Sequence, residues 1–206
     1  REPLASRFYQ QRHAAPRALH AIARNRLLMA RALGYAFEPE APVRHGLATA
    51  GAASSGKVFC LHGTARPEKE YPEADWLALA RGLVQAGLTP VFPAGNAGEA
   101  RRAQGLAQGC PGAEALPRMP LAELVPQLAA APAVIGVDTG LMHLAAALGK
   151  TGVGLYPATD PARFGAVAEA GAPAIVNLSD AADLRPEAVL AAFLALIRPV
   201  PDGSPL

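Results

Sequence analysis

Asp138, Thr139 and Gly140 lie where an apolar run meets an alanine-rich helical pattern, in the stretch VIGVDTGLMHLAAALG (134–149). A glycine where a helix begins lets a ligand approach unpaired backbone N–H groups, and the positive end of the helix dipole favours phosphate. Thr139 adds a hydroxyl, and Asp138 is better suited to accept hydrogen bonds from sugar hydroxyls because it would repel a phosphate. His143 lies one turn into the helix and would face the same ligand. The alternative is that Asp138 or Thr139 only caps the helix and that His143 is a packed, hydrogen-bonded histidine.

Lys69 follows a second junction of this kind, in LHGTARPEKEYP (61–72). Thr64 comes directly after a β-type run, and an ammonium group a few residues later could neutralise a diphosphate leaving group, a point-charge role that suits lysine. The alternative is a solvated charge beside Glu68 and Glu70, and an exposed loop lysine of that kind would contribute little to stability. The sequence contains neither GxGxxG nor GxxxxGK[ST], which excludes the standard dinucleotide fingerprint and the P-loop.

Glu99 closes the glycine-rich stretch FPAGNAGE (92–99) and opens the next helical pattern. A carboxylate at that position can accept hydrogen bonds from both hydroxyls of a ribose, as the acidic residue of dinucleotide-binding folds does. The alternative is a first-turn glutamate favoured by the helix dipole. Met119, in LPRMP, could lie against a base, although a loop methionine also fills gaps in packing.

Short β-type runs alternate with helical patterns from Val58 onward, and the residues described above follow these runs. Strands that alternate with helices form βαβ units with a parallel sheet covered on both faces, and ligands bind outside the carboxyl ends of such strands. We therefore predict a doubly wound, Rossmann-like α/β domain over residues 58–198 whose strand ends converge on one ligand. The predicted strands are 58–62, 89–95, 133–138, 153–157 and 174–178.

Apolar stripes at helical spacing predict the helices. One stripe comprises Trp76, Leu79, Ala80, Leu83 and Val84, and the same spacing recurs in Val189, Leu190, Phe193, Leu194 and Ile197. Residues 97–108 and 120–130 are helices of weaker pattern. Residues 17–34 form the most basic helix, which Gly34 is expected to stop. Residues 35–57 read as a linker or loop, and 199–206 as a flexible tail.

The composition excludes several classes of protein. The 206 residues are 51% hydrophobic and 17% charged, which is ample for a buried core, and the net charge of +2 is too mild to indicate nucleic-acid binding. No apolar stretch approaches the ~20 residues that cross a bilayer. Cys60 and Cys110 lack metal-type spacing and are expected to be reduced, buried thiols of a cytoplasmic protein. No set of residues has metal-ligand spacing, so no metal is expected.

The blocks LHGTARPEKEYPEADW, FPAGNAGE, LPRMPLAEL, VIGVDTGLMHLAAALGK and LYPATDPARFGAV resemble the lipopolysaccharide heptosyltransferases of glycosyltransferase family 9, which have the GT-B architecture. VDTGLxH is shared among heptosyltransferases generally, whereas HGTARxxKxYP points to the first type. The resemblance extends from Arg1 to about Val167. It implies an inverting transfer of L-glycero-D-manno-heptose from ADP-heptose to a Kdo residue of the lipid A inner core, at the cytoplasmic face of the inner membrane.

The same resemblance implies roles for individual residues. Lys69 and Asp138 would be the catalytic residues that this chain contributes. Thr64 and Lys69 would face the diphosphate and the sugar end of the donor, Glu99 would hold the ribose, Met119 would border the adenine, Asp138 would touch the heptose, and Thr139, Gly140, Leu141 and His143 would line the diphosphate. Two positions depart from the family pattern: Ala65 replaces a frequent second threonine, and Met142 replaces a small polar residue.

A GT-B enzyme has two Rossmann-like domains, and the resemblance places the acceptor site and a catalytic aspartate base in the first of them. Residues 1–34 look like the end of that acceptor domain, so we expect this chain to be the donor-binding half of a longer protein. Two other classes remain open. One is another nucleotide-sugar enzyme of the same architecture, such as a second-type heptosyltransferase or an epimerase. The other is a non-catalytic nucleotide-binding module.

Overall fold

The computed structural model describes residues 5–39, 41–47 and 56–197. The described residues fall into two units, one from the ranges 1–42 and 162–164 and the other from 43–161 and 165–206. The predicted tail, 199–206, lies outside the described residues, as do residues 40 and 48–55 of the predicted linker. Within the larger unit, the linker residue His45 has its Nε2 3.0 Å from the carbonyl oxygen of Val167, so this end of the linker packs against the domain that follows it.

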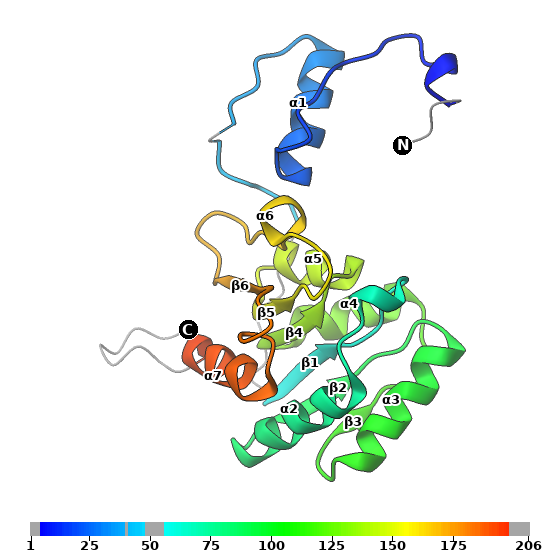
Figure 1. Cartoon of the computed structure of the whole chain (residues 1–206), viewed down its shortest axis with the longest axis vertical. Helices are drawn as coiled ribbons and strands as arrows, with labels where there is room; N and C mark the ends of the chain where they lie inside the picture. Colours follow the sequence, from blue (N-terminus) through cyan, green and yellow to red (C-terminus); the bar gives the residue numbers. More distant parts are fainter. Residues whose placement is uncertain (1–4, 40, 48–55, 198–206) are drawn as a thin grey trace. The chain divides into compact units, whose positions relative to one another are not determined.

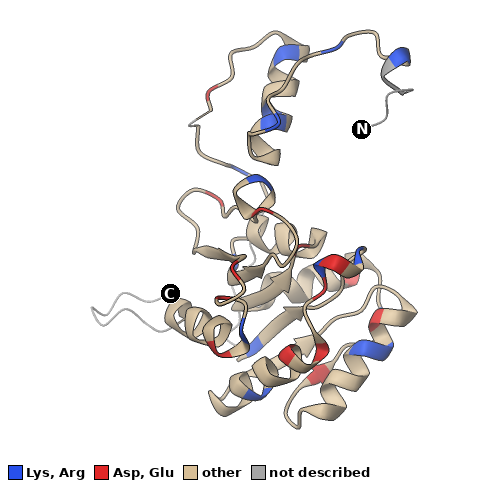
Figure 2. Cartoon of the chain, in the orientation of Figure 1, with Lys and Arg blue, Asp and Glu red and all other residues tan. Residues whose placement is uncertain are grey.

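The smaller unit contains a 3₁₀ turn, η1 (Ala5–Phe8), and the helix α1 (Ala21–Leu33). The helix begins four residues later than predicted because the ring of His20 accepts a hydrogen bond from the N–H of Ile22 and so caps it. It ends as predicted at Gly34, whose φ of 74° lies in the left-handed region that glycine adopts at little cost. Basic side chains lie along α1 (Figure 2).

A parallel sheet forms the centre of the larger unit, with the strand order β3-β2-β1-β4-β5-β6 (Figure 1). Every pair of neighbouring strands is parallel. The order reverses between β1 and β4, which is the topological switch point where doubly wound sheets bind their ligands. The predicted fold class is therefore confirmed. The strands are β1 (Lys57–Leu61), β2 (Thr89–Phe92), β3 (Glu114–Ala115), β4 (Ala133–Val137), β5 (Thr151–Leu155) and β6 (Ile175–Leu178).

Helices cover both faces of this sheet, as their apolar stripes predicted. Buried side chains of α2, α3 and α7 form one core with the sheet, and those of α4 and α5 form a second core on the opposite face. These helices are α2 (Glu73–Gln85), α3 (Ala97–Gly109), α4 (Leu121–Ala130), α5 (Gly140–Ala147) and α7 (Pro186–Ile197), and a short 3₁₀ helix, η2 (Pro67–Lys69), precedes α2. Three of the four residues of a further short helix, α6 (Pro161–Phe164), belong to the smaller unit.

The core beneath α2 is built on aromatic side chains. Trp76 is fully buried and meets Tyr71 and Phe92 edge-to-face, with ring centroids 5.4 and 6.0 Å apart. Such pairs add to the free energy of area burial. The hydroxyl of Tyr71 donates to the carbonyl oxygen of Leu184 at 2.7 Å, which ties the loop after η2 to the start of α7. The segment that carries Lys69 is thus anchored on the core.

Cys60 and Cys110 are free and buried, as the sequence predicted. Burial raises the pKa of both thiols, so they stay protonated and pack as small apolar groups. No helix in the described ranges is both long enough and apolar enough to cross a membrane.

Candidate functional site

The carboxyl ends of β1 and β4 are neighbours in the sheet, and both carry residues that the sequence singled out. Leu61 of β1 is paired with Gly136 of β4, so the segments that begin at Gly63 and at Asp138 leave the sheet side by side. The hydroxyl of Thr64 donates to the backbone carbonyl of Asp138 at 3.4 Å. The strand order, which no local pattern in the sequence reveals, therefore brings the two predicted junctions together.

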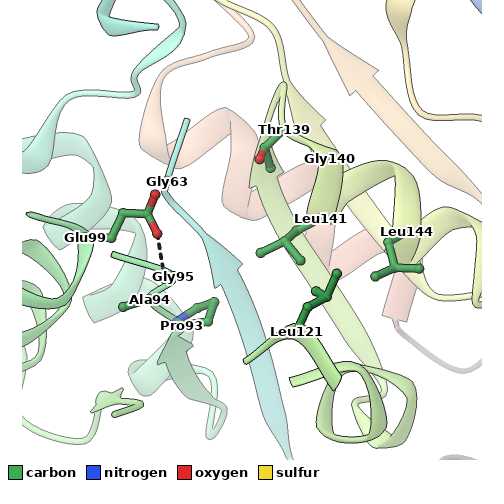
Figure 3. A pocket seen from close by; sticks show the side chains of 10 residues that line it. All are labelled: Gly63, Pro93, Ala94, Gly95, Glu99, Leu121, Thr139, Gly140, Leu141 and Leu144. Carbon is green, nitrogen blue, oxygen red and sulfur yellow. Dashed lines mark hydrogen bonds between the residues drawn. The ribbon is translucent and has the colours of Figure 1, made fainter. Parts of the chain in front are cut away.

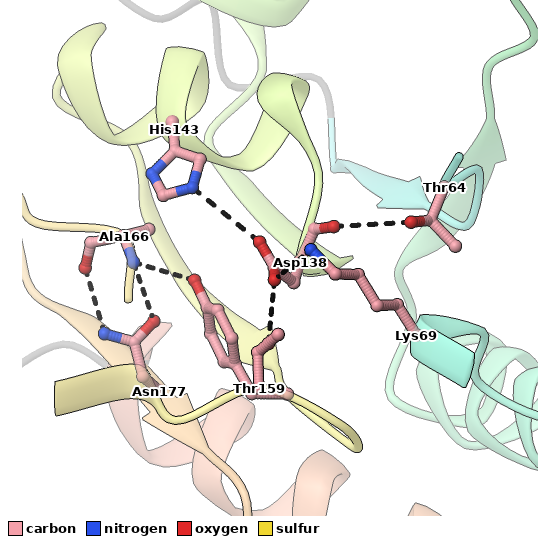
Figure 4. A network of polar contacts seen from close by, with 8 residues as sticks. Thr64, Lys69, Asp138, His143, Thr159, Ala166 and Asn177 are labelled. Atoms are coloured by element: carbon pink, nitrogen blue, oxygen red, sulfur yellow. Dashed lines mark hydrogen bonds and ion pairs between the residues drawn. The ribbon is translucent and has the colours of Figure 1, made fainter. Parts of the chain in front are cut away.

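Asp138 is the centre of a polar network that Figure 4 shows. Its side chain is 8% exposed, and one carboxylate oxygen, Oδ2, accepts hydrogen bonds from Lys69 Nζ and from Thr159 Oγ1, each at 2.7 Å. The other oxygen, Oδ1, lies 3.9 Å from Nε2 of His143. His143 is 42% exposed, so its ring reaches both Asp138 and solvent.

The partners of Asp138 hold it in the charged form. Burial acts to raise the pKa of this carboxyl group, but hydrogen bonds from His143, Lys69 and Thr159, together with the charge of Lys69, outweigh burial and lower the pKa. Asp138 is thus a carboxylate across the physiological range. The site places a fixed negative charge directly beside a lysine ammonium.

Two simpler interpretations of the sequence are wrong. The Asp138 carboxylate accepts hydrogen bonds from the side chains of Lys69 and Thr159 rather than capping the backbone of α5, and Thr139, which is the N-cap residue, makes no capping hydrogen bond with its side chain to any described residue. Lys69 is not a solvated loop charge, since its side chain is only 19% exposed and is paired. Lys69 is therefore also expected to contribute to stability, contrary to the expectation for an exposed lysine.

A cavity of about 530 Å³ opens at the same sheet edge (Figure 3). Strand-end glycines and the Glu99 carboxylate form one side of it, and the first turn of α5 forms the other. Leucines from α4 and α5 add an apolar surface on the side of α5. The lining residues are Gly63, Pro93, Ala94, Gly95, Glu99, Leu121, Thr139, Gly140, Leu141 and Leu144. An apolar surface with a few polar groups at its margin is typical of sites for small molecules.

Glu99 lies at the margin of this cavity, held in a reciprocal cap at the start of α3. Its Oε1 accepts from Asn96 Nδ2 at 2.7 Å, and its own N–H donates to Asn96 Oδ1 at 2.9 Å. Its Oε2 accepts from the N–H of Gly95 at 2.7 Å. A Cβ at Gly63 would lie 2.7 Å from the Glu99 carboxyl carbon, so a larger residue there would displace this carboxylate from its place beside the end of β1. The position is both a helix cap and a cavity wall.

The remaining predicted residues divide into two groups. Thr139, Gly140 and Leu141 line the cavity, and a Cβ on Gly140 would meet no atom within 4 Å, so the N-terminus of α5 is accessible. Met119 packs against the core of α4 and α5 and is not among the described residues that line the cavity. Leu121, two residues further along the chain, lies there instead.

Sequence reasoning missed residues that support this site. Thr159, in the quoted block LYPATDPARFGAV, follows β5 and bonds Asp138; the rule that ligands lie beyond strand ends could have identified it. His62 is fully buried, and its Nε2 lies 2.9 Å from the carbonyl oxygen of Pro93, which joins the ends of β1 and β2. Arg102 donates to the carbonyl oxygen of Tyr71 at 2.6 Å and lies 3.3 Å from Glu70, so it braces the segment after Lys69.

No metal-binding arrangement is evident in the described part of the chain, since it holds no group of three or more His, Cys, Asp or Glu side chains gathered in that way. The N-terminus of α5 carries partial positive charge at the edge of the cavity. Lys69 lies against Asp138, the residue before the cavity-lining Thr139, and Arg118 donates to the carbonyl oxygen of Gly95 at 3.1 Å.

Several known proteins are similar to this chain in sequence and in fold. The chain is 43% identical over 171 residues to lipopolysaccharide heptosyltransferase 1 of Pseudomonas aeruginosa, covering 81% of this chain and 48% of the relative. It is 41% identical over 170 residues to lipopolysaccharide heptosyltransferase 1 of Salmonella typhimurium, covering 80% of this chain and 53% of the relative. E. coli heptosyltransferase WaaC with ADP-2-deoxy-2-fluoro heptose matches with a TM-score of 0.71 and 33% identity, over 93% of this chain and 61% of that one.

The chain thus spans about half the length of the curated relatives that it matches. The sequence profile named glycosyltransferase family 9 (heptosyltransferase) matches residues 1–191, which is most of the chain. By this match and by its relatives, the chain belongs to glycosyltransferase family 9, the heptosyltransferase family.

Proposed function

We propose that this chain is the donor-binding half of an inverting glycosyltransferase that moves L-glycero-D-manno-heptose from ADP-heptose to Kdo of the lipid A inner core. The observation that carries the proposal is the pairing of Lys69 with Asp138 beside the accessible end of α5, in a chain of this family. Its relatives include a heptosyltransferase structure with an ADP-heptose analogue at 33% identity. Residues 1–34 would be the end of the acceptor domain and 35–57 the linker.

The donor would lie along the cavity, with its nucleoside toward α3 and its sugar toward β4. Glu99 would accept from the ribose hydroxyls, with the apolar surface of Leu121 and Leu144 beneath the adenine, in the place first expected for Met119. Thr139, Gly140, Leu141 and His143 would line the diphosphate at the start of α5, where the helix dipole favours negative charge. Asp138 would accept hydrogen bonds from the heptose.

In the transfer step, the acceptor hydroxyl oxygen forms a bond to the anomeric carbon while the bond from that carbon to the diphosphate oxygen breaks. ADP leaves with the electron pair, and the hydroxyl proton passes to a base in the acceptor domain. Lys69, Thr64 and the N–H groups around Gly140 would stabilise the negative charge that grows on the departing diphosphate, which is often the largest catalytic contribution. This half therefore supplies leaving-group stabilisation, and no step of it calls for a metal.

The proposed place of action is the cytoplasmic face of the inner membrane, because the acceptor is anchored there by its lipid. The chain would approach that surface as a peripheral protein.

Calorimetry with ADP and with ADP-heptose tests the donor-half proposal. The folded 206-residue chain should bind both ligands with a Kd in the millimolar range or tighter, a free energy of at least about −4 kcal/mol. GDP and UDP serve as control nucleotides and should bind more weakly. A chain that is folded by circular dichroism and binds no ADP at millimolar concentrations would exclude the proposal.

A transfer assay with ADP-heptose and Kdo-lipid A tests whether the catalytic base lies outside this chain. The isolated chain should transfer no heptose, because the proposed base belongs to the acceptor domain. Turnover by the purified 206-residue chain would show instead that it holds a complete site.

A further inference from the structure

The side chain of Thr159 points toward Asp138, whereas its neighbours in the chain face solvent. The residues around it, Pro157, Ala158 and Asp160, are exposed, whereas Thr159 is half-buried. Its hydroxyl donates to Oδ2 of Asp138 at 2.7 Å. The segment that follows β5 therefore delivers one hydroxyl group to a carboxylate at the end of β4.

Thr159 and Lys69 share the same oxygen of Asp138, and they reach it from different parts of the chain (Figure 4). The terminal torsion of an aspartate is broad, so one partner does not define how the carboxylate is turned. A lysine defines it poorly, because its ammonium group sits on a flexible four-carbon stem. A threonine hydroxyl on a fixed backbone is a better reference point. The hydrogen bond from Thr159 is therefore the contact best suited to set the orientation of the carboxylate, to which the ammonium of Lys69 is also bonded.

The backbone near Thr159 is itself anchored to the sheet. Tyr156 is buried, and its N–H donates to the carbonyl oxygen of Leu178 at 2.8 Å. Its hydroxyl accepts from the N–H of Ala166 at 2.7 Å. Asn177, on β6, donates from Nδ2 to the carbonyl oxygen of Ala166 at 2.9 Å. The chain is therefore held on both sides of Thr159, which gives its hydroxyl a defined place.

We propose that Thr159 is a positioning residue of the donor site, whose hydroxyl holds the Asp138 carboxylate, and through it the Lys69 ammonium, in the orientation that meets the donor. This rests on the proposed function, since it assigns Asp138 and Lys69 to the sugar and diphosphate of an ADP-sugar. Thr159 itself touches Asp138 rather than the donor. Its contribution lies in the hydroxyl group and not in the volume of the side chain.

Three variants of the 206-residue chain separate the hydroxyl from the side-chain volume. Thr159→Val keeps the shape and removes the hydroxyl, Thr159→Ser keeps the hydroxyl and removes the methyl group, and Thr151→Val makes the same change at the opposite end of β5. Circular dichroism confirms that each variant is folded. One measurement is the affinity for ADP-L-glycero-D-manno-heptose by calorimetry, and the other is the titration of the Asp138 carboxyl carbon by NMR.

Thr159→Val should bind the ADP-sugar roughly tenfold more weakly, the equivalent of one lost charge-assisted hydrogen bond. The pKa of Asp138 should rise, because one of the hydrogen bonds that lower it is gone. Thr159→Ser should stay within about threefold of the parent chain in affinity for the ADP-sugar. Thr151→Val should bind it as tightly as the parent chain does. Neither change removes a hydrogen bond to a charged group. Lys69, His143 and Tyr156 also act on the Asp138 carboxylate. The titration is therefore repeated in a His143→Asn background, where the effect of the Thr159 hydroxyl on Asp138 is measured without the histidine.

The outcomes separate this proposal from the proposed function. Equal affinity and equal Asp138 titration in the parent chain and Thr159→Val would overturn the role of Thr159. A Thr159→Ser variant as weak as Thr159→Val would also overturn it, because the methyl group would then be what matters. If the parent chain binds no ADP-sugar, the donor assignment falls, and with it the role of Thr159 toward a donor. An unchanged Asp138 titration would then show that the hydroxyl does not even hold the carboxylate.

Discussion

The ammonium nitrogen of Lys69 lies 2.7 Å from Oδ2 of Asp138, across 69 positions of the chain. The carboxylate is 8% exposed and the lysine side chain 19% exposed, so both charges have lost much of their contact with water. Removing one partner of such a pair leaves the other poorly compensated, which costs far more than breaking an exposed pair. The contact therefore links the stability of the fold to the electrostatics of the candidate site.

Lys69→Met should lower both stability and donor affinity. It removes a charge-assisted hydrogen bond to a buried carboxylate, so we expect a loss of about 1–3 kcal/mol in the free energy of unfolding, measured by urea titration. ADP should bind at least tenfold more weakly by calorimetry, since a charge-assisted hydrogen bond to the diphosphate is worth about 1.5–3 kcal/mol.

Lys57→Met is the matched control for that variant. Lys57 also pairs at 2.7 Å, with Glu114, but the two side chains are 42% and 43% exposed. Its loss should cost about 0.2–1 kcal/mol of stability and leave ADP binding unchanged. Equal effects of the two substitutions would contradict the special position of Lys69.

Asp138→Asn should change the acid dependence of stability. The pKa of Asp138 is lowered in the folded protein, so the unfolded chain binds more protons as the pH falls toward and below the ordinary value of 3.8. The carboxylate thus contributes stability that is fully present above that pH and is lost below it. Urea midpoints between pH 7 and pH 2.5 should show the parent chain well above Asp138→Asn at neutral pH, with the gap closing in acid. A constant gap would mean that the charge of Asp138 contributes nothing.

Gly140→Ala should separate folding from binding. The backbone at Gly140 is not in the left-handed region, and a Cβ there would meet no atom within 4 Å, so the helix can accept alanine. Thermal melting should be unchanged or improved by up to about 1 kcal/mol, because alanine loses less backbone entropy than glycine on folding. ADP affinity should fall roughly fivefold, about one hydrogen bond, because the methyl group blocks the approach of a phosphate to the helix N–H groups. Unaltered ADP affinity would place the diphosphate elsewhere.

Glu99→Gln tests the ribose contact through a change of ligand. If the Glu99 carboxylate accepts from the ribose hydroxyls, the parent chain should bind ADP more tightly than 2′-deoxy-ADP by about 1.5–3 kcal/mol, the worth of a hydrogen bond to a charged group. The glutamine variant should show a smaller difference, as measured by calorimetry with both ligands. Equal discrimination by both proteins would leave Glu99 as the cap of α3 alone.

The local features of this fold could be predicted from the sequence. The alternation of β-type runs with apolar helical stripes predicted the parallel sheet, and all the strands that it named are present with ends that differ by a few residues. Gly34 stops α1 because a left-handed residue is needed at that point. The two residues of β3 and the four of α6 were missed, since segments so short show no period.

The role of Asp138, Thr139 and Gly140 in binding a ligand stays a prediction, but their place at the end of a strand was within reach of the sequence, because ligands bind beyond the carboxyl ends of parallel strands. Their contacts were not. That Lys69 and Thr159 converge on one oxygen of Asp138 depends on β1 and β5 lying on either side of β4, and strand order is settled by how whole elements pack, not by any local pattern. The sequence by itself determined the elements and the chemical groups at their ends; the tertiary structure decided which of those groups meet, because a contact across 69 positions forms only when the sheet between them is assembled.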